Sequence, residues 1–392
     1  MTRFTLPFAA ALLCATSAFS QEAQCGGELS TWLEGMTAEA VAAGVGQKGL
    51  AALANAKDDK KVLGRDRSQQ VFAQTFNEFA GRMISDYRLK QGAANLKKHA
   101  ATFARAEQDY GVPGPVIAAF WALETDFGAV QGDFDTLDAL VTLAHDCRRP
   151  QLFRPQIVPL LKLIDNGTLP ANVQGAWAGE LGQTQILPSD YLDKGRDGDG
   201  DGVVDLRGSA ADVIVTTANF IKSLGWRAGE DWMQEVRVPK EMDWTDSGRE
   251  NQHPRSHWVT AGLTAADGSA LPSDDRPSSL VLPMGRKGPA FLIYSNFDVY
   301  LQWNQSLIYT LTAGNMATRF AGAPAFRPGN PDRGLTIDEM KQLQEKLAAR
   351  GHDVGKIDGV LGTGTRTALQ KVQQEMGLPA DGWPTQQLLQ VL

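Results

Sequence analysis

The chain has 392 residues, which is enough for two or three domains with a large core. Its composition is 43% hydrophobic and 21% charged, as is ordinary for a soluble globular protein. The formal net charge of −7 makes the chain a poor candidate for binding nucleic acid or an anionic membrane surface.

Residues 1–20 predict a secretory signal peptide. Arg3 supplies the positive start, Leu6 to Ala15 form an apolar run, and Ala18-Phe19-Ser20 is a small-x-small cleavage site. The run is too short for a permanent membrane span, and no other segment is long and apolar enough for one. The residue before Cys14 is not small, which argues against a lipoprotein. The alternative is a buried N-terminal helix.

Cleavage would leave two cysteines, Cys25 and Cys147. An exported protein meets an oxidising compartment, so an even pair favours one disulfide bond. The bond would join the mature N-terminus to the segment just after the Glu124 helix, which is described next. The alternative is two separate buried thiols.

A short apolar stretch predicts a helix that carries a catalytic carboxyl group. Pro113-Gly114-Pro115 precedes the stretch and Gly128 follows it as a stop signal. Phe120 and Trp121 lie four and three residues before Glu124, so they share its helix face. Burial by these rings and the negative end of the helix dipole would raise the pKa of Glu124 toward ~6, as a general acid requires. The alternative is a surface glutamate on an amphipathic helix.

The stretch F-W-A-L-E-T-D-F-G, residues 120–128, resembles the catalytic-glutamate motif of the B-type lytic murein transglycosylases. These are lysozyme-like enzymes that cut the glycan strands of bacterial peptidoglycan. Later motifs match the same family in the same order. Residues 335–392 resemble the three-helix type-1 peptidoglycan-binding module, with D-G-x-x-G and T-R-x-A-L motifs.

The resemblance implies a mainly α fold with a lysozyme-like catalytic domain in residues 21–322, built of helical subdomains and a few short strands. A Pro/Gly linker at 323–334 would lead to the module at 335–392. The hydrophobic pattern itself predicts helices over 28–106 and at 137–144, 153–163, 213–224 and 297–311. Short strands are expected near 235–239, 279–282 and 289–294.

Residues 175–189 predict an irregular glycine-rich loop that lets backbone approach a ligand closely. The loop resembles the family signature G-x-W-A-G-x-x-G-x-x-Q-x-x-P-S, whose glutamine contacts sugar. The resemblance implies a sugar contact for Gln185 and, less strongly, for Gln183. Ala176 replaces a serine of some relatives, so the hydrogen bonding of that serine is absent here or comes from another group. Glu180 is the rival acid in this loop.

The next segment, D-G-D-G-D-G-V-V-D at 197–205, matches the opening of an EF-hand calcium loop. Four carboxylates this close would repel one another without a cation. Position 12 is Gly208, so Asp212 is the expected closing ligand, as in the calcium loop of the family. The role would be structural, with no cofactor for the chemistry, and the alternative is a metal-free turn. The predicted ligands are Asp197, Asp199, Asp201, Val203, Asp205 and Asp212.

The sequence W-N-x-S-x-x-Y at 303–309 resembles the Y-N-x-S-x-x-Y core of the family, in which the asparagine and the last tyrosine face the catalytic acid. Those roles pass to Asn304 and Tyr309. Trp303 replaces a tyrosine, which keeps an aromatic platform for sugar and loses a hydroxyl. Phe220 falls where relatives offer another aromatic ring. The alternative for these residues is a polar-capped core helix.

His253 and His257 have the i, i+4 spacing of a zinc-binding helix. Pro254 biases His253 away from helical geometry, and no acidic residue lies between the two histidines. A zinc peptidase is therefore a weak alternative.

The resemblance implies cleavage of the bond between N-acetylmuramic acid and N-acetylglucosamine in peptidoglycan glycan strands, with formation of a 1,6-anhydro end. Ordinary glycoside hydrolysis uses two carboxylates, whereas the sequence offers one well-placed acid, Glu124. A lysozyme-type hydrolase and a non-catalytic wall-binding protein are the alternatives. We expect a periplasmic monomer, with other cell-wall enzymes as candidate partners.

Overall fold

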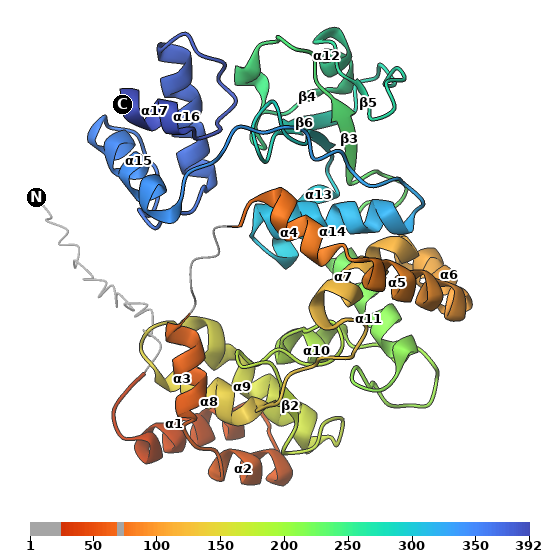
Figure 1. Ribbon diagram of the computed structural model, residues 1–392. Helices are drawn as coiled ribbons and strands as arrows, with labels where there is room; N and C mark the ends of the chain where they lie inside the picture. Colours follow the sequence, from red (N-terminus) through yellow and green to blue (C-terminus); the bar gives the residue numbers. More distant parts are fainter. Residues whose placement is uncertain (1–24, 69–73) are drawn as a thin grey trace, which may run out of the picture.

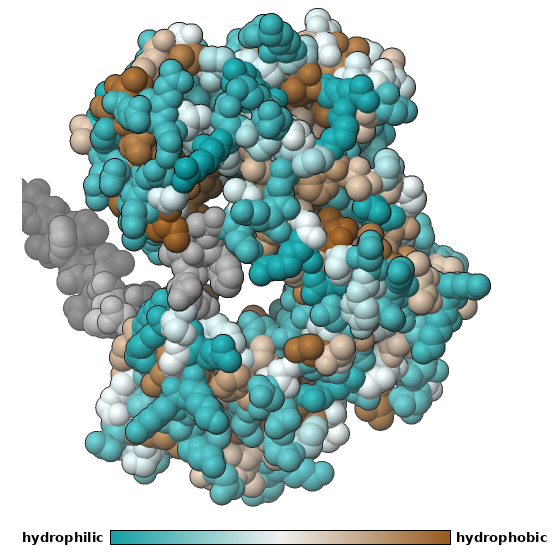
Figure 2. Space-filling model, in the orientation of Figure 1, coloured by the Kyte–Doolittle hydropathy of each residue, from teal (hydrophilic) through white to brown (hydrophobic). Residues whose placement is uncertain are grey.

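The computed structural model describes residues 25–68 and 74–392, so the predicted signal peptide at 1–20 lies outside the described residues. The described part contains seventeen α-helices and seven short strands, which confirms the mainly helical class. None of its helices is both long and apolar enough to cross a membrane. The face shown in Figure 2 is mostly hydrophilic, with scattered hydrophobic residues.

A helical lobe at the bottom of Figure 1 is built around α9, against which α8, α2 and α10 pack. Its apolar side chains belong to the largest hydrophobic core of the molecule. The lobe consists of α1 (Leu29–Ala42), α2 (Gln47–Ala54), α3 (Lys60–Arg67), α8 (Thr136–His145), α9 (Pro150–Asp165) and α10 (Pro188–Lys194), with a small ribbon of β1 (Phe134–Asp135) and β2 (Gln174–Gly175).

The middle of the molecule is organised around α7, which packs on α14 and α5. All residues of α7 except Pro115 and Glu124 are buried, as expected for a helix that is apolar all round. The helices here are α4 (Phe76–Met83), α5 (Asp86–Lys98), α6 (Ala100–Tyr110), α7 (Gly114–Thr125), α11 (Ala210–Ser223), α13 (Phe297–Trp303) and α14 (Leu307–Phe320).

Helix α7 ends three residues earlier than the glycine stop signal indicated. Asp126 and Phe127 have positive φ angles of 51° and 60° and already turn the chain away from the helix. Arg88 of α5 donates to the Asp126 carboxylate at 2.5 Å and holds this turn. Glu124 is therefore the last residue but one of α7.

The predicted helix over 297–311 is instead two helices, α13 and α14, separated at residues 304–306. Asn304 is extended, and its side-chain oxygen accepts a hydrogen bond from the Ser306 backbone N–H at 2.9 Å. The Ser306 hydroxyl in turn accepts from the Tyr309 N–H at 3.4 Å. Short polar side chains that bind nearby backbone in this way end one helix and begin another.

A five-stranded antiparallel sheet forms a third lobe, with the strand order β4-β6-β7-β3-β5. Three of its strands lie where the sequence predicted strands, with ends shifted by a few residues. The lobe also holds α12 (Arg255–Thr260) and the short 3-10 helix η1 (Trp244–Asp246). The strands are β3 (Met233–Arg237), β4 (His253–Pro254), β5 (Thr264–Ala265), β6 (Pro277–Val281) and β7 (Phe291–Ile293).

The C-terminal module has three helices, α15 (Ile337–Ala349), α16 (Thr363–Glu375) and α17 (Gln386–Val391), around a core of its own. A capping box between Thr336 and Glu339 begins α15. The preceding segment, residues 323–334, has no helix or strand but lies against both α4 and the sheet lobe. The Phe326 ring packs 5.0 Å from that of Phe76 in α4, and Arg327 Nε donates to Glu235 of β3 at 3.0 Å.

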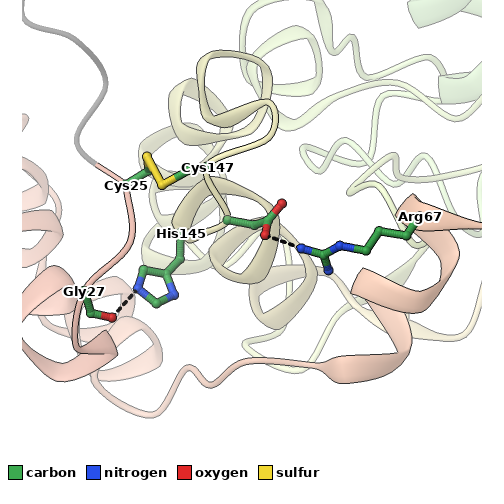
Figure 3. The surroundings of a disulfide bond; sticks show 6 residues. Cys25, Gly27, Arg67, His145 and Cys147 are labelled. Atoms are coloured by element: carbon green, nitrogen blue, oxygen red, sulfur yellow. Dashed lines mark hydrogen bonds and ion pairs between the residues drawn. A yellow bond between two sulfur atoms is a disulfide. The ribbon is translucent and has the colours of Figure 1, made fainter.

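The predicted disulfide bond joins Cys25 to Cys147, with 5.3 Å between the Cα atoms (Figure 3). Because β1 and α8 follow α7, the bond holds the segment after α8 rather than the one directly after the Glu124 helix. Hydrogen bonds support it on both sides, from the Gly26 N–H to the His145 carbonyl at 2.8 Å and from His145 Nε2 to the Gly27 carbonyl at 3.1 Å.

Candidate active site

A cleft of about 460 Å³ opens beside the exposed part of Glu124. Its walls come from α7, the glycine-rich loop, the start of α10, α11 and the end of α13. The lining residues are Glu124, Ala176, Trp177, Glu180, Gln185, Ile186, Leu187, Asp190, Phe220, Gln302, Trp303 and Asn304.

Two donors from the break between α13 and α14 converge on one oxygen of Glu124. The Trp303 indole donates to Glu124 Oε1 at 3.0 Å, and the Tyr309 hydroxyl donates to the same oxygen. Phe120 of α7 stacks on the Trp303 ring with 4.3 Å between centroids. Trp303 ends α13 and Tyr309 lies in the first turn of α14, so the helix break aims both groups at the acid.

The pKa of Glu124 is raised from 4.5 to about 7. Burial of the carboxyl group is the main cause, because a low-dielectric surrounding disfavours the charged form. The hydrogen bonds from Tyr309 and Trp303 pull the pKa down, and the charge of Glu180 pushes it up. The rise has the direction that the sequence indicated, and burial is one of the two causes that the sequence named, the helix dipole being the other. The shift leaves Glu124 able to hold or release a proton near neutral pH.

The two glutamines of the glycine-rich loop have different surroundings. Gln185 lines the cleft with a positive φ of 51°, and its Nε2 donates to the Gly182 carbonyl at 2.9 Å. Gln183 is only 7% exposed. Its Oε1 accepts from the Trp121 indole and its Nε2 donates to the Arg207 carbonyl, each at 2.9 Å. Because the whole amide is engaged inside the protein, we assign Gln183 a structural role and withdraw the predicted sugar contact.

Ala176 lies in the wall of the cleft, where the sequence left open which group replaces the serine of some relatives. The indole N–H of Trp303 is such a group, since it donates to Glu124. Sequence reasoning treated Trp303 as an aromatic platform alone. The exchange of a hydroxyl donor for an indole donor was the signal available in the motif.

Glu180 lies in the same cleft as Glu124, which corrects the expectation of a single acid there. Burial raises the pKa of Glu180 and the positive charge of Arg149 lowers it. The sequence offers Glu180 few apolar neighbours in its glycine-flanked loop, and burial in the folded chain nevertheless raises its pKa. Asp190 and Trp177 also line the cleft without having been predicted.

Three of the predicted calcium ligands come together where the loop before α11 meets the first turn of that helix. The carboxylate oxygens of Asp197, Asp199 and Asp212 lie within 4.8 Å of one another, and Asp212 is buried. Three converging carboxylates are a donor set that suits a hard cation such as Ca²⁺. Asp201 and Asp205 are outside this cluster of carboxylates, and one oxygen of Asp205 accepts the backbone N–H of Arg207 at 2.9 Å. The part of Val203, whose backbone carbonyl was the expected ligand, stays a prediction.

Comparison with protein families gives two matches. Residues 28–318 match the family described as "Transglycosylase SLT domain", and residues 336–392 match "Putative peptidoglycan binding domain". The membrane-bound lytic murein transglycosylase B of Escherichia coli is 28% identical over 242 residues, which are 61% of this chain and 66% of that protein. A spore cortex-lytic enzyme of Bacillus cereus is 44% identical over 50 residues, which are 13% of this chain and 19% of that protein.

Solved structures extend the likeness to the fold. SltB3 from Pseudomonas aeruginosa, in complex with NAG-anhNAM-pentapeptide, superposes with a TM-score of 0.86 at 36% identity, covering 93% of this chain and 99% of that chain. A lytic transglycosylase of Escherichia coli in complex with calcium gives a TM-score of 0.64 at 25% identity, covering 76% of this chain and 96% of that chain.

Proposed function

Because the chain belongs to the family of transglycosylase SLT domains and carries a peptidoglycan-binding domain, we propose that it is a lytic murein transglycosylase that leaves a 1,6-anhydro end on N-acetylmuramic acid. The observation that carries this proposal is Glu124, which has a pKa of about 7 and lies in a cleft under two hydrogen-bond donors. The relative solved with a NAG-anhNAM-pentapeptide supports the product assignment.

In the first step Glu124 acts as a general acid. Trp303 and Tyr309 both donate to Oε1, so Oε2 is the oxygen left to carry the proton. Oε2 gives this proton to the bridging oxygen of the glycosidic bond as the bond from that oxygen to C1 of the muramic acid breaks. The two donors then stabilise the carboxylate that results.

In the second step the Glu124 carboxylate acts as a base. It takes the proton of the C6 hydroxyl of the same muramic acid while the C6 oxygen forms the new bond to C1. Glu124 is thereby protonated again, and no water is consumed. Because the attacking hydroxyl belongs to the substrate, proximity replaces a second catalytic carboxylate.

Side chains around the acid would hold the sugar. Phe220 and Trp303 lie with their ring centroids 5.2 Å apart in the wall of the cleft and supply apolar surfaces. Gln185 and Asn304 line the same cleft and offer polar groups for the sugar and its acetamido group. Tyr309 would orient the Glu124 carboxyl group through its hydrogen bond to Oε1.

For the aspartate cluster we propose one structural Ca²⁺ held by Asp197, Asp199 and Asp212. Mutual repulsion of these carboxylates and the calcium complex of the Escherichia coli relative support this assignment. We also propose that the protein works in the periplasm as a monomer on glycan strands.

The presence of Glu180 in the cleft favours one alternative, a lysozyme-type hydrolase. In that reaction a second carboxylate attacks C1 or activates water. Burial raises the pKa of Glu180, however, and a raised pKa lowers the fraction of the carboxylate form that either role needs.

Digestion of purified sacculi by wild type, Glu124→Gln and Glu180→Gln, read by mass spectrometry, tests the proposal. We expect wild type to release anhydro ends, which are one water lighter than hydrolysed ends. Glu124→Gln should lose at least ~10²-fold in rate, typical of removing a general acid. Glu180→Gln is the matched control and should keep the anhydro product. Hydrated ends from wild type would establish the hydrolase, and an unchanged rate in Glu124→Gln would establish a binding protein.

A further inference from the structure

A second group of potential metal ligands lies in the sheet lobe. Figure 1 shows this lobe at the top, apart from the helical lobe at the bottom, which contains α10. Asp246 ends η1, His253 begins β4 and His257 lies in α12. One ligand atom from each of the three side chains lies within 4.8 Å of the other two.

The two imidazole rings are arranged around a single carboxylate. His257 Nε2 lies 2.9 Å from Asp246 Oδ2, and His253 Nε2 lies 3.8 Å from Asp246 Oδ1. The rings stack with 4.2 Å between centroids and 16° between planes. Their Nε2 atoms therefore face the same carboxylate, as two nitrogen ligands of one ion would.

The fold brings the two histidines together and adds the acidic ligand that the sequence pattern lacked. His253 is in a strand, as Pro254 indicated, and yet α12 begins so soon afterwards that His257 lies against it. The acidic residue comes from Asp246, which precedes the histidine pair in the chain. The Trp258 ring packs nearly perpendicular to both imidazoles, with centroids 5.3 and 5.0 Å away, and limits their movement.

We propose that Asp246, His253 and His257 bind one divalent transition-metal ion of the zinc class. Two imidazole nitrogens and one carboxylate oxygen are the donor types that Zn²⁺ takes in proteins, with water completing the tetrahedron. Ligand atoms at Zn²⁺ bond lengths lie about 3.3 Å apart in a tetrahedron. The two imidazole nitrogens lie 2.9 and 3.8 Å from different oxygens of Asp246, and one ligand atom from each residue lies within 4.8 Å of the other two, so side-chain rotations would bring the three to that spacing.

The ligand types separate this site from the aspartate cluster. Ca²⁺ prefers oxygen ligands alone, which only the cluster of Asp197, Asp199 and Asp212 offers. Nitrogen ligands favour Zn²⁺ and related ions. When calcium occupies the aspartate cluster, added Zn²⁺ should bind at the site formed by Asp246, His253 and His257.

An ion at this site would hold the loop on which the C-terminal module rests. Ser247 follows Asp246 directly, and its carbonyl and hydroxyl accept the Gln370 amide of α16 at 2.8 and 3.2 Å. A bond from Asp246 to the ion would tie η1 to β4 and α12 and so fix these two acceptors. The role of the ion is structural.

The test is calorimetric titration of ZnCl₂ into the metal-stripped full chain with calcium present. We expect one Zn²⁺ per chain in wild type, and an affinity lower by at least about tenfold in each of Asp246→Asn, His253→Gln and His257→Gln. His352→Gln removes a histidine of the module and should bind like wild type. All three ligand variants should digest sacculi at the wild-type rate, because Glu124 and its donors are intact.

Substitution with Co²⁺ gives a second measurement on unmutated protein. A four-coordinate ion with nitrogen ligands should produce intense visible absorption bands, and added Zn²⁺ should abolish them. The proposal is overturned if wild type binds no Zn²⁺ in the presence of calcium, if any ligand variant that keeps the wild-type circular dichroism spectrum binds with unchanged affinity, or if the Co²⁺ protein has the weak spectrum of an ion bound by water alone.

Discussion

The ionisation of Glu124 results from two opposed local effects. Burial favours the neutral acid, whereas the donors Trp303 and Tyr309 favour the carboxylate. Without the donors, burial alone would raise the pKa of Glu124 further, and the residue would not release its proton readily enough to act as an acid. Without burial, the residue would be ionised at neutral pH and could not act as an acid. The two donors and the buried site together give the pKa of about 7.

Replacing Glu124 by Gln should stabilise the protein, and by an amount that depends on pH. The pKa in the folded chain, about 7, is above the ordinary value of 4.5. Between these values the native state keeps a proton that the unfolded chain has released, so this group makes stability fall as pH rises. The shift corresponds to about 3 kcal/mol.

The measurement is thermal or denaturant unfolding of both proteins between pH 4 and pH 8. The stability difference in favour of Glu124→Gln should grow through the window from 4.5 to about 7 and stay constant on either side. Glu180→Asp keeps a titrating group in the cleft and serves as the control. A difference that does not change with pH would show that Glu124 titrates normally and is no general acid at neutral pH.

At the scale of elements, α7 is held by a series of hydrogen bonds that begins in the aspartate loop, the segment between α10 and α11 that contains Asp197 and Asp199. The Leu206 carbonyl accepts the Gln183 N–H at 2.8 Å, and the Arg207 carbonyl accepts the Gln183 amide. Gln183 then binds the Trp121 indole on α7, one turn before Glu124. An ordered conformation of the aspartate loop therefore helps to fix the position of the helix that carries Glu124.

Asp199→Asn should change the stability of the protein in opposite directions with and without calcium. With a chelator present, removing one of three crowded carboxylates relieves repulsion, so the variant should be at least as stable as wild type. With calcium present, wild type should gain stability by mass action, about 2.7 kcal/mol at a concentration 100 times the dissociation constant. The variant should gain much less.

Unfolding curves measured with calcium and with a chelator check this crossover. Asp193→Asn is the matched control, because Asp193 pairs with Lys194 outside the cluster and should respond to calcium like wild type. Equal calcium responses in wild type and Asp199→Asn would contradict the assignment of the site.

Local signals predicted the elements whose causes are local. Proline and glycine residues framed α7, and the Thr336–Glu339 capping box marked the start of α15. Several features depend on residues far apart in the chain, and no local pattern contains them. The internal hydrogen bonds of Gln183 with Trp121 and Arg207 are of this kind. The break at Asn304 is intermediate, since its capping side chains were visible but the apolar periodicity continued across it.

At the scale of the whole molecule, the C-terminal module is docked on the sheet lobe (Figure 1). Arg366 of α16 donates to the carbonyls of Leu282 and Pro283 at 3.2 and 2.7 Å, and burial lowers its pKa to about 10. Trp383 joins the hydrophobic cluster that lies between the sheet and the helices α4, α13 and α14. Beside these contacts lies a cavity of about 770 Å³ whose walls include Gln302 of α13 and Thr363 of the module. Gln302 also lines the cleft at Glu124, so the docked module lies next to the proposed active site.

Arg366→Ala should release the module without unfolding it. The change removes two charge-assisted hydrogen bonds and leaves two carbonyl groups unpaired, which weakens docking by about 2–3 kcal/mol. A change of this size moves the docking equilibrium by about 30- to 150-fold. The module should stay folded, because its core of residues such as Leu343, Leu369 and Val372 does not include Arg366.

Small-angle X-ray scattering of the full chain measures this release as a larger radius of gyration. Lys371→Ala on the exposed side of α16 is the matched control and should scatter like wild type. An unchanged radius in Arg366→Ala would mean that Trp383 and Gln370 suffice to hold the module. An expanded chain that still digests sacculi at the wild-type rate would show that the cleft at Glu124 works alone. A slower rate would show that the wall of the shared cavity takes part in binding the substrate, because the chemistry of Glu124 is untouched.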